Sequence, residues 1–289
     1  MKIVTDSGTD LYLSQEKIAE LDIHIVPLVV SIGGKAYHEG VDIEPDVFYD
    51  LLVKSSTPAK TSQPSVGDFA ATYKRLASID PDILSIHMSS GLSGTLNAAK
   101  EAAKLVPEAH ITHIDTRTLS AAAGWQVLAA ARASKAGWVK ERIIALTESI
   151  SVASESLYTV KDLRYLIQGG RISHLKGLLA SVLGIKPLIG VEKVKGTYVQ
   201  RGQVRTFQRA IEGIVDLISR QHALQSALRV QVCHASNLEG AAMLHDLIDK
   251  RFKCTWLPVG RLSLVLGAHT GPSMVAVAYA PLSVFADIP

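Results

Sequence analysis

The chain has 289 residues, of which 47% are hydrophobic and 20% charged, and its formal net charge is +3. This composition is typical of a globular protein with a large apolar core, and it excludes an intrinsically disordered chain. The small net charge and the absence of any basic run argue against a nucleic-acid-binding protein. Cys233 and Cys254 are expected to be free thiols, and no apolar run approaches the ~20 residues that span a bilayer. We therefore expect a soluble, cytoplasmic protein.

Strand and helix patterns alternate along the N-terminal half of the chain. The apolar segments predict strands at 2–5, 23–32, 83–87 and 111–114. A hairpin insertion is predicted at about 28–45, and a polar loop runs from Thr57 to Ser65. Helices are predicted from about Ser14 and at 46–54, 67–78, 95–105, 120–136 and 141–150. This alternation favours βαβ units and a Rossmann-like parallel sheet.

The pattern changes in the C-terminal half, where strands follow one another more often. Glu192 to Gly202 reads as a hairpin with Gly196 at its turn, which favours an α+β domain with a mixed or antiparallel sheet. We place the domain boundary near residue 155, so that the domains cover 1–155 and 156–289. Strands are predicted at 156–160, 186–192, 197–201, 228–235, 254–259 and 273–279, and helices at 161–167, 174–182, 206–223 and 237–251.

Several common catalytic and cofactor motifs are missing from the sequence. Neither G-x-G-x-x-G nor G-x-x-x-x-G-K-[ST] occurs, which argues against a dinucleotide or nucleotide phosphate site. Gly91 to Thr95 (GLSGT) resembles a nucleophile elbow around Ser93 but has Thr95 where the second Gly belongs. A Ser93-dependent acyl hydrolase or transferase therefore stays the weaker alternative. His110 and His113 would point to opposite faces of a strand, so we expect no metal site.

Hydroxyl-rich loops follow the predicted strands of the first domain. Any one of them could simply supply turn residues and helix caps. In a parallel sheet, however, the carboxyl ends of the strands meet at one edge, where ligands bind. Neutral hydroxyls beside helix N-termini suit a singly charged, carboxylate-like head group. The loops are Asp6–Thr9, Thr61–Ser65, Ser89–Thr95 and Asp115–Thr116.

Two further segments carry polar residues beside glycines. Gly169 and Gly170 end a predicted helix, and Arg171 follows, either as a helix-end contact or as a functional cation. Gly267 to Pro272 is predicted to be a tight loop that carries His269. A single histidine in such a loop is usually structural, although the flanking glycines allow a ligand to approach closely.

Taken together, the motifs resemble those of the DegV family of bacterial fatty-acid-binding proteins. That family includes FakB, the acyl-carrying subunit of a two-component fatty acid kinase. The resemblance extends almost from one end of the chain to the other. The matching segments are Val4–Ser7 (VTDS), Val26–Leu28 (VPL), Gly40–Ile43 (GVDI), Thr61–Ser65 (TSQPS), Ser89–Thr95 (SSGLSGT), Gly169–Ile172 (GGRI), Ile185–Pro187 (IKP) and His269–Pro272 (HTGP).

The resemblance implies a two-domain α/β fold and a bound long-chain fatty acid such as palmitate. The acyl tail would lie in a buried tunnel that the second domain covers, with the carboxylate at the domain interface. Thr61 and Ser93 would bind the carboxylate, and Ser62 and His269 would lie near it. The protein would be a lipid-binding carrier in phospholipid metabolism, with no cofactor and no catalysis of its own.

The resemblance also implies a partner protein. Arg171 and Arg205 match family positions that engage a separate kinase, which phosphorylates the bound acid to an acyl phosphate. The chain departs from the family pattern at three positions. Gly8 replaces the usual Thr, and Ser273 and Met274 replace small residues. The first could loosen the head-group loop, and the other two could narrow or redirect the tunnel.

Overall fold

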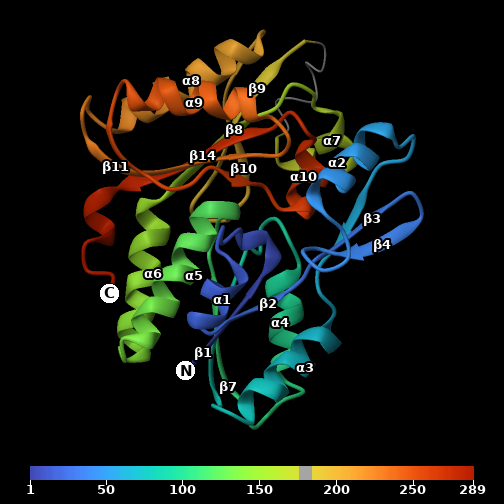
Figure 1. The fold of residues 1–289 in the computed structure, drawn as a ribbon, viewed down its shortest axis with the longest axis vertical. Helices are drawn as coiled ribbons and strands as arrows, with labels where there is room; N and C mark the ends of the chain where they lie inside the picture. The colour runs from blue at the N-terminus through green and yellow to red at the C-terminus, as the bar shows by residue number, and fades with distance from the viewer. Residues whose placement is uncertain (176–183) are drawn as a thin grey trace.

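The computed structural model describes residues 1–175 and 184–289, so the helix predicted at 174–182 lies largely outside the described residues. Its sheets and helices form stacked layers (Figure 1). Helices α5 (Ser120–Lys135) and α6 (Lys140–Ala153) lie between two sheets. No helix in the described part of the chain is long and apolar enough to cross a membrane.

The first sheet is parallel, as the alternating pattern predicts. Its strand order is β2-β1-β6-β7. Helices α3 (Val66–Ala77) and α4 (Thr95–Ala103) pack on one face, and α5 and α6 pack on the other. Because both faces are covered, the strands are rich in apolar residues. The strands are β1 (Lys2–Asp6), β2 (Ile23–Val26), β6 (Asp82–His87) and β7 (His110–Asp115), and the short helix α1 (Gln15–Glu20) joins the first two.

The second sheet is mixed, which confirms the fold class predicted for the C-terminal half. Its order is β10-β9-β8-β14-β11-β12, and β13 also pairs with β11. Helices α8 (Phe207–Gln221) and α9 (Leu238–Asp249) cover its outer face (Figure 1). The strands are β8 (Glu155–Thr159), β9 (Lys186–Val191), β10 (Tyr198–Val204), β11 (Ala227–His234), β12 (Lys253–Trp256), β13 (Gly260–Arg261) and β14 (Val275–Pro281). The boundary near residue 155 stays a prediction.

A small third sheet corrects two of the predictions. The single strand predicted at 23–32 is two strands, β2 in the first sheet and β3 (Val29–Ile32) in the third. The chain leaves the first sheet at Pro27, which has no N–H to donate to a neighbouring strand. The predicted loop at 57–65 contains β5 (Lys60–Ser62), which pairs with β3. Strand β4 (Lys35–His38) and helix α2 (Pro45–Lys54) complete this region.

A third correction concerns the segment that carries His269. The tight loop predicted at 267–272 is in fact mostly the end of helix α10 (Leu264–Thr270). Ser263 caps this helix by accepting a hydrogen bond from Leu266 N–H (3.3 Å). Helix α7 (Arg164–Gln168) packs beside α10 and ends, as predicted, at Gly169 and Gly170. Short 3₁₀ turns lie at Ser7–Thr9, Arg171–His174 and Leu282–Phe285.

The loop after β6 packs tightly against the turn between β9 and β10. Ser89 Oγ donates a hydrogen bond to Gly196 O (2.8 Å). Gly196 has a φ of +63°, and Gly91 lies so close to Lys195 that a Cβ there would overlap with the Lys195 carbonyl oxygen. Glycine is therefore required at both positions, one for its backbone conformation and one for the close approach.

We expect Gly91→Ala to lower the free energy of unfolding by about 1–3 kcal/mol, because the new methyl group meets backbone rather than a flexible side chain. Gly67→Ala is the matched control. It lies in the first turn of α3 with only Ser65 Oγ within 4 Å, at 3.5 Å, so we expect no loss of stability. Urea denaturation of both variants measures the difference. Equal midpoints would contradict the packing described for this loop.

Candidate functional site

Five of the six residues predicted for ligand or partner binding line one cavity between the two halves of the chain. This cavity has a volume of about 70 Å³. Its polar wall is formed by these five residues and Gln63, namely by Thr61, Ser62, Gln63, Ser93, Arg171 and His269. Its remaining wall is mostly apolar and is formed by Leu28, Met88, Leu92, Tyr198, Val265 and Leu266.

A hydrogen bond between Thr61 and His269 joins the two halves of the site. Thr61 lies on β5 and His269 in the last turn of α10, and Thr61 Oγ1 lies 2.8 Å from His269 Nε2. Burial, helped by the charge of Arg171, lowers the pKa of His269 to about 4. The imidazole is therefore neutral at pH 7, and Arg171 is the cation of this wall. Gly169 lies so close to His269 Nδ1 that no side chain would fit there.

Ser93 lies in the loop after β6, just before the first residue of α4. Its hydroxyl is hydrogen-bonded to Thr95 Oγ1 (2.8 Å) and accepts a bond from Thr95 N–H (3.3 Å). The backbone turns tightly here, since Ser93 N–H donates to Ser89 O (3.1 Å). A helix N-terminus has free N–H groups and a partial positive charge, so this position suits an anion.

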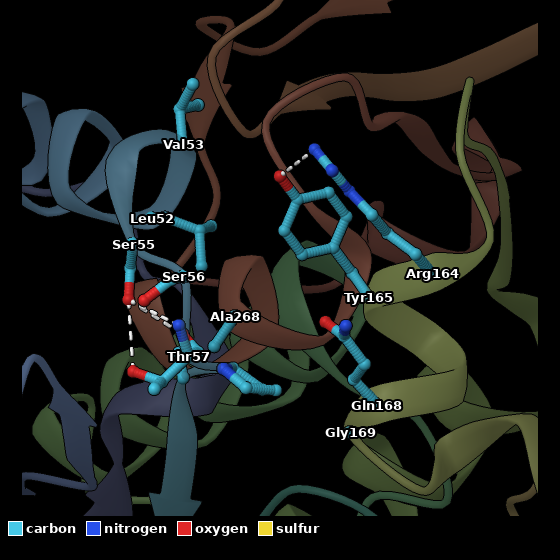
Figure 2. A pocket seen from close by; sticks show the side chains of 12 residues that line it. Leu52, Val53, Ser55, Ser56, Thr57, Arg164, Tyr165, Gln168, Gly169 and Ala268 are labelled. Carbon is cyan, nitrogen blue, oxygen red and sulfur yellow. Dashed lines mark hydrogen bonds between the residues drawn. The ribbon is translucent and has the colours of Figure 1, made fainter.

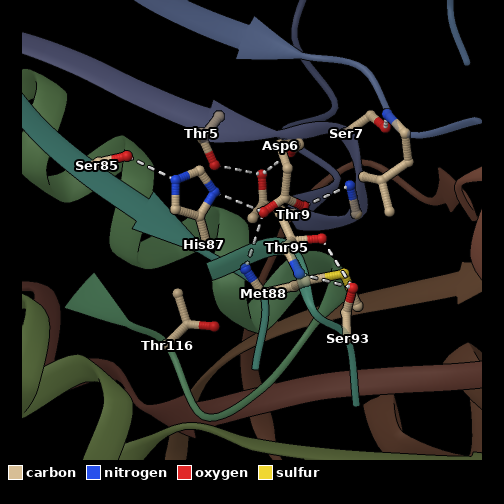
Figure 3. Close-up of polar contacts among 12 residues, drawn as sticks. Thr5, Asp6, Ser7, Thr9, Ser85, His87, Met88, Ser93, Thr95 and Thr116 are labelled. Carbon is tan, nitrogen blue, oxygen red and sulfur yellow. Dashed lines mark hydrogen bonds and ion pairs between the residues drawn. The ribbon is translucent and has the colours of Figure 1, made fainter. Parts of the chain in front are cut away.

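A buried polar chain lies beneath this loop and was not predicted from the sequence. His87 Nδ1 lies 2.9 Å from Asp6 Oδ2, and His87 Nε2 lies 2.6 Å from Ser85 Oγ (Figure 3). Ser85 Oγ in turn lies 2.7 Å from Tyr73 Oη. The order resembles a Ser-His-Asp triad, but Ser85 is fully buried and no substrate can reach it. Asp6 also accepts a bond from Met88 N–H (3.1 Å), so the chain anchors the start of the Ser93 loop.

The two arginines predicted to engage a partner lie in different environments. Arg171 is half-buried in the cavity wall, and one of its N–H groups donates to Gly169 O (2.9 Å). Arg205 follows β10 directly, and its side chain is exposed. Arg205 is therefore the one predicted site residue that the structure does not bring to the cavity.

A second, apolar cavity of about 30 Å³ lies farther along the domain interface. Tyr158 and Met274 line it, together with Leu119 and Leu262. These four residues belong to the same hydrophobic cluster as Tyr198 of the first cavity. The rings of Tyr158 and Tyr198 meet edge to face with their centroids 5.4 Å apart. Apolar side chains therefore connect the two cavities.

Comparison with known proteins identifies the family. A family model described as an uncharacterised protein of the DegV family matches residues 1–282. The chain belongs to the DegV family. A DegV domain-containing protein of Deinococcus radiodurans is 32% identical over 279 residues, which are 96% of this chain and 95% of that protein.

Two solved structures of DegV proteins share the fold. "Fatty Acid Binding of a DegV family Protein from Thermus thermophilus" is 27% identical with a TM-score of 0.87, covering 97% of this chain and 99% of that chain. "DegV, a fatty acid binding protein from Bacillus subtilis" is 28% identical with a TM-score of 0.84, and the match covers 96% of this chain and 98% of that chain. These similarities confirm the predicted fold of a parallel-sheet N-terminal domain and a mixed-sheet C-terminal domain.

The three departures from the DegV pattern have local structural correlates. A Cβ at Gly8 would lie 2.8 Å from Met88 Sδ, so the glycine makes room for the methionine of the cavity wall. Ser273 Oγ accepts a hydrogen bond from Lys161 N–H (3.0 Å), which gives it a structural partner. Met274 is buried and lines the apolar cavity, and its effect on the tunnel stays a prediction.

A larger cavity of about 270 Å³ lies on the other side of Gly169 (Figure 2). Ser55 and Thr57 lie across it from Arg164 and Tyr165 (Figure 2). The hydroxyls of Ser55 and Thr57 bond to each other (3.2 Å), and Arg164 donates to Tyr165 Oη (2.9 Å). These polar groups already satisfy one another. The smaller cavity, with its convergent hydroxyls and apolar extension, is therefore the better candidate in this DegV protein.

We expect the His269 ring to stay neutral as the pH is lowered from 8 to 5, because its pKa lies near 4 rather than 6.5. The unfolded chain takes up that proton near pH 6.5, so this group should reduce stability as the pH falls from 6.5 towards 4. Arg171→Ala should raise the pKa of His269, although burial is the larger cause. Nitrogen NMR of the histidine rings measures the pKa of His269 in both proteins. A titration midpoint near pH 6.5 for His269 in the wild type would contradict the described burial.

Proposed function

We propose that this DegV protein binds a long-chain fatty acid such as palmitate and presents its carboxylate to a separate fatty acid kinase. One observation carries the proposal. Neutral polar groups and apolar side chains line the same cavity, the polar groups including those of Thr61, Ser93 and His269. Such a pocket matches an amphipathic molecule with a small anionic head.

The polar wall suits a carboxylate more than a phosphate or a neutral group. Ser93 can donate one O–H bond to a carboxylate oxygen, and Thr61 can donate another while its oxygen accepts a bond from His269 Nε2–H. Arg171 is the cation of this wall, and because one of its N–H groups already donates to Gly169 O, we assign it to the kinase partner rather than to the carboxylate. Each hydrogen bond to a charged group contributes about 1.5–3 kcal/mol.

The apolar tail would lie in the hydrophobic cluster that joins the two cavities. Burying an acyl chain contributes about 0.8 kcal/mol per methylene, on the order of 10 kcal/mol gross for sixteen carbons before the costs of binding. The cavities of about 70 and 30 Å³ are too small for such a chain, since one water alone takes about 30 Å³ of liquid volume. Side chains such as Tyr158 and Met274 must therefore rotate as the tail enters.

The DegV relatives support this assignment. The solved proteins of Thermus thermophilus and Bacillus subtilis are described as fatty acid binding, and each aligns with nearly all of this chain. We extend that property to this protein because the cavity chemistry fits it independently.

The site favours a carrier over the alternative, a Ser93-dependent acyl hydrolase or transferase. A serine nucleophile needs a base within hydrogen-bond reach. The Ser93 hydroxyl is bonded to Thr95, and the nearby His269 Nε2 is bonded to Thr61. The chemistry would instead come from a kinase protein, which also fits the absence of nucleotide-binding motifs in the sequence. Arg205 is exposed and available to such a partner in the cytoplasm.

We expect Thr61→Val and Ser93→Ala each to weaken binding of a fluorescent acyl probe about tenfold or more, because each removes one hydrogen bond to the carboxylate. Ser90→Ala is the matched control. Ser90 lies in the same loop, but its hydroxyl donates to Asp115 Oδ2 (2.5 Å) and does not line the cavity. Wild-type affinity in Ser93→Ala would remove Ser93 from the site. Hydrolysis of nitrophenyl acyl esters that disappears in Ser93→Ala would favour the hydrolase.

We expect Arg205→Ala to retain its fatty acid but to support less acyl-phosphate formation when a fatty acid kinase and ATP are added. Arg171→Ala should also lose coupling to the kinase and keep the ligand. Arg209→Ala serves as the control, because Arg209 is a nearby exposed arginine that pairs with Glu212 (3.0 Å). Lipid content and acyl-phosphate yield are measured on the same samples. A lipid-free Arg171→Ala would assign Arg171 to the ligand rather than to the partner.

A further inference from the structure

Two buried carboxyl groups of the N-terminal domain bond to the start of α10. Asp10 Oδ1 accepts a hydrogen bond from Ser263 N–H (3.1 Å), and Glu39 Oε1 accepts one from Leu264 N–H. Asp10 lies in the loop after β1, and Glu39 follows the hairpin strand β4. The first N–H groups of a helix have no partner inside it. The N-terminal domain therefore supplies the missing acceptors of a helix in the C-terminal domain.

Glu39 is connected to both sides of the head-group cavity. Its other oxygen accepts a bond from Ser7 Oγ (2.7 Å), and Ser7 Oγ accepts one from Leu28 N–H (3.0 Å). Leu28 lines the cavity on the N-terminal side, and α10 lines it through Val265, Leu266 and His269. Glu39, together with Ser7, thus joins the wall formed by Leu28 to the wall formed by α10.

Asp10 makes a similar connection to the apolar cavity. Its second oxygen accepts bonds from Ser120 Oγ (2.6 Å) and Tyr12 Oη (3.2 Å). Ser120 is the first residue of α5 and lines the apolar cavity. Asp10 therefore joins the start of α5 to the start of α10.

We infer that Asp10 and Glu39 are positioning residues of the ligand site, which fix α10 so that His269 meets Thr61. This inference rests on the proposed function in one respect, namely that the ligand is an anion. Helix α10 has seven residues, so its two ends lie about 10 Å apart. A shift of its start against the N-terminal domain moves His269 with it.

The positioning role of Asp10 and Glu39 can be tested by pH, because both carboxyl groups have raised pKa values. Burial is the largest cause that raises the pKa of Asp10 to about 7 and that of Glu39 to about 8, and their mutual repulsion adds to the shift in Glu39. Both groups therefore lose their protons between about pH 6 and 9. The unfolded chain loses them near pH 4, so their contribution to stability falls as the pH rises from 4 towards 8.

Four further ionisable groups near the pair keep their protonation state across that window. Burial raises the pKa of Tyr12, Tyr49 and Cys233 above it, and that of His269 lies near 4. A fatty acid carboxyl resembles that of Glu, whose ordinary pKa is about 4.3, so the ligand is already ionised. The charged side chains that face the pair are Asp6, which repels Asp10, and Arg261. Arg261 lines a further cavity, of about 370 Å³, together with Asp10 and Glu39.

We expect the affinity for an ionised acyl probe to fall roughly threefold to tenfold as the pH rises from 6 to 9, since two negative charges form about 10 Å from the ligand carboxylate. Glu39→Gln keeps an acceptor for Leu264 N–H, and its amide can donate to Ser7 Oγ. Its affinity for the probe should equal that of the wild type at pH 6 and should fall less between pH 6 and pH 9. Asp10→Asn should likewise reduce this fall in affinity, and the double variant should show almost no fall.

The control is Asp46→Asn. Asp46 also links the two domains, through Arg261 (2.6 Å), but its side chain is 87% exposed and does not line the cavity. Its pH profile should match that of the wild type.

A second measurement separates the positioning role from ligand binding. Nitrogen NMR of the His269 ring in the unliganded protein reports its hydrogen bond to Thr61. The signal should shift between pH 6 and 9 in the wild type, change in Glu39→Ala, and shift less in Glu39→Gln. An unaltered His269 signal and an unaltered pH profile in both Glu39 variants would overturn the inference. If the wild type binds no acyl probe while the NMR shifts appear, the proposed function fails and the positioning role stands.

Discussion

Backbone N–H groups that are buried must be hydrogen-bonded, and at the start of α10 this constraint shapes the whole interface between the two domains. Helix α10 belongs to the C-terminal part of the chain, yet Asp10 and Glu39 of the N-terminal part accept its first N–H groups. Its last turn is held by the bond from His269 to Thr61. The cavity between the domains therefore depends on contacts between residues more than 200 positions apart in the sequence.

The chemistry of this cavity follows from how few charges it contains. Burial keeps His269 neutral, Thr61 and Ser93 contribute hydroxyls, and Arg171 is the single cation among the described residues of the lining. Such a wall can hold one carboxylate without the strong positive field that phosphate groups require. The hydrophobic cluster behind it accounts for the other half of an amphipathic ligand. A weakly charged wall next to a hydrophobic cluster supports the proposed carrier over a hydrolase.

Much of the fold could be predicted from local patterns, and the failures have a common cause. The central strands β1 and β6 of the first sheet are buried on both faces, so their apolar runs and the hydroxyl-rich loops after them are visible in the sequence. Strand β5 has only three residues and exists because β3 pairs with it, and β5 positions Thr61. Helix α10 contains a glycine and two β-branched residues, and acceptors for its first N–H groups come from distant segments. Tertiary contacts, rather than propensity, determine both elements.

The same reasoning explains what could be predicted of the site. The resemblance to DegV proteins identified Thr61, Ser62, Ser93, Arg171 and His269, and the structure brings these residues to one cavity. No local signal marked Asp10 and Glu39, because an acidic residue in a polar loop is ordinarily solvated. The chain from Asp6 to Tyr73 was also invisible, since its members come from separate elements of the first domain.

Mass spectrometry of the purified protein under native conditions, before and after extraction with organic solvent, tests the central claim most directly. The account predicts a mass excess equal to one long-chain fatty acid per chain, which extraction removes and which reappears as the free acid in the extract. A chain with no mass excess that also fails to take up an added long-chain fatty acid would contradict it.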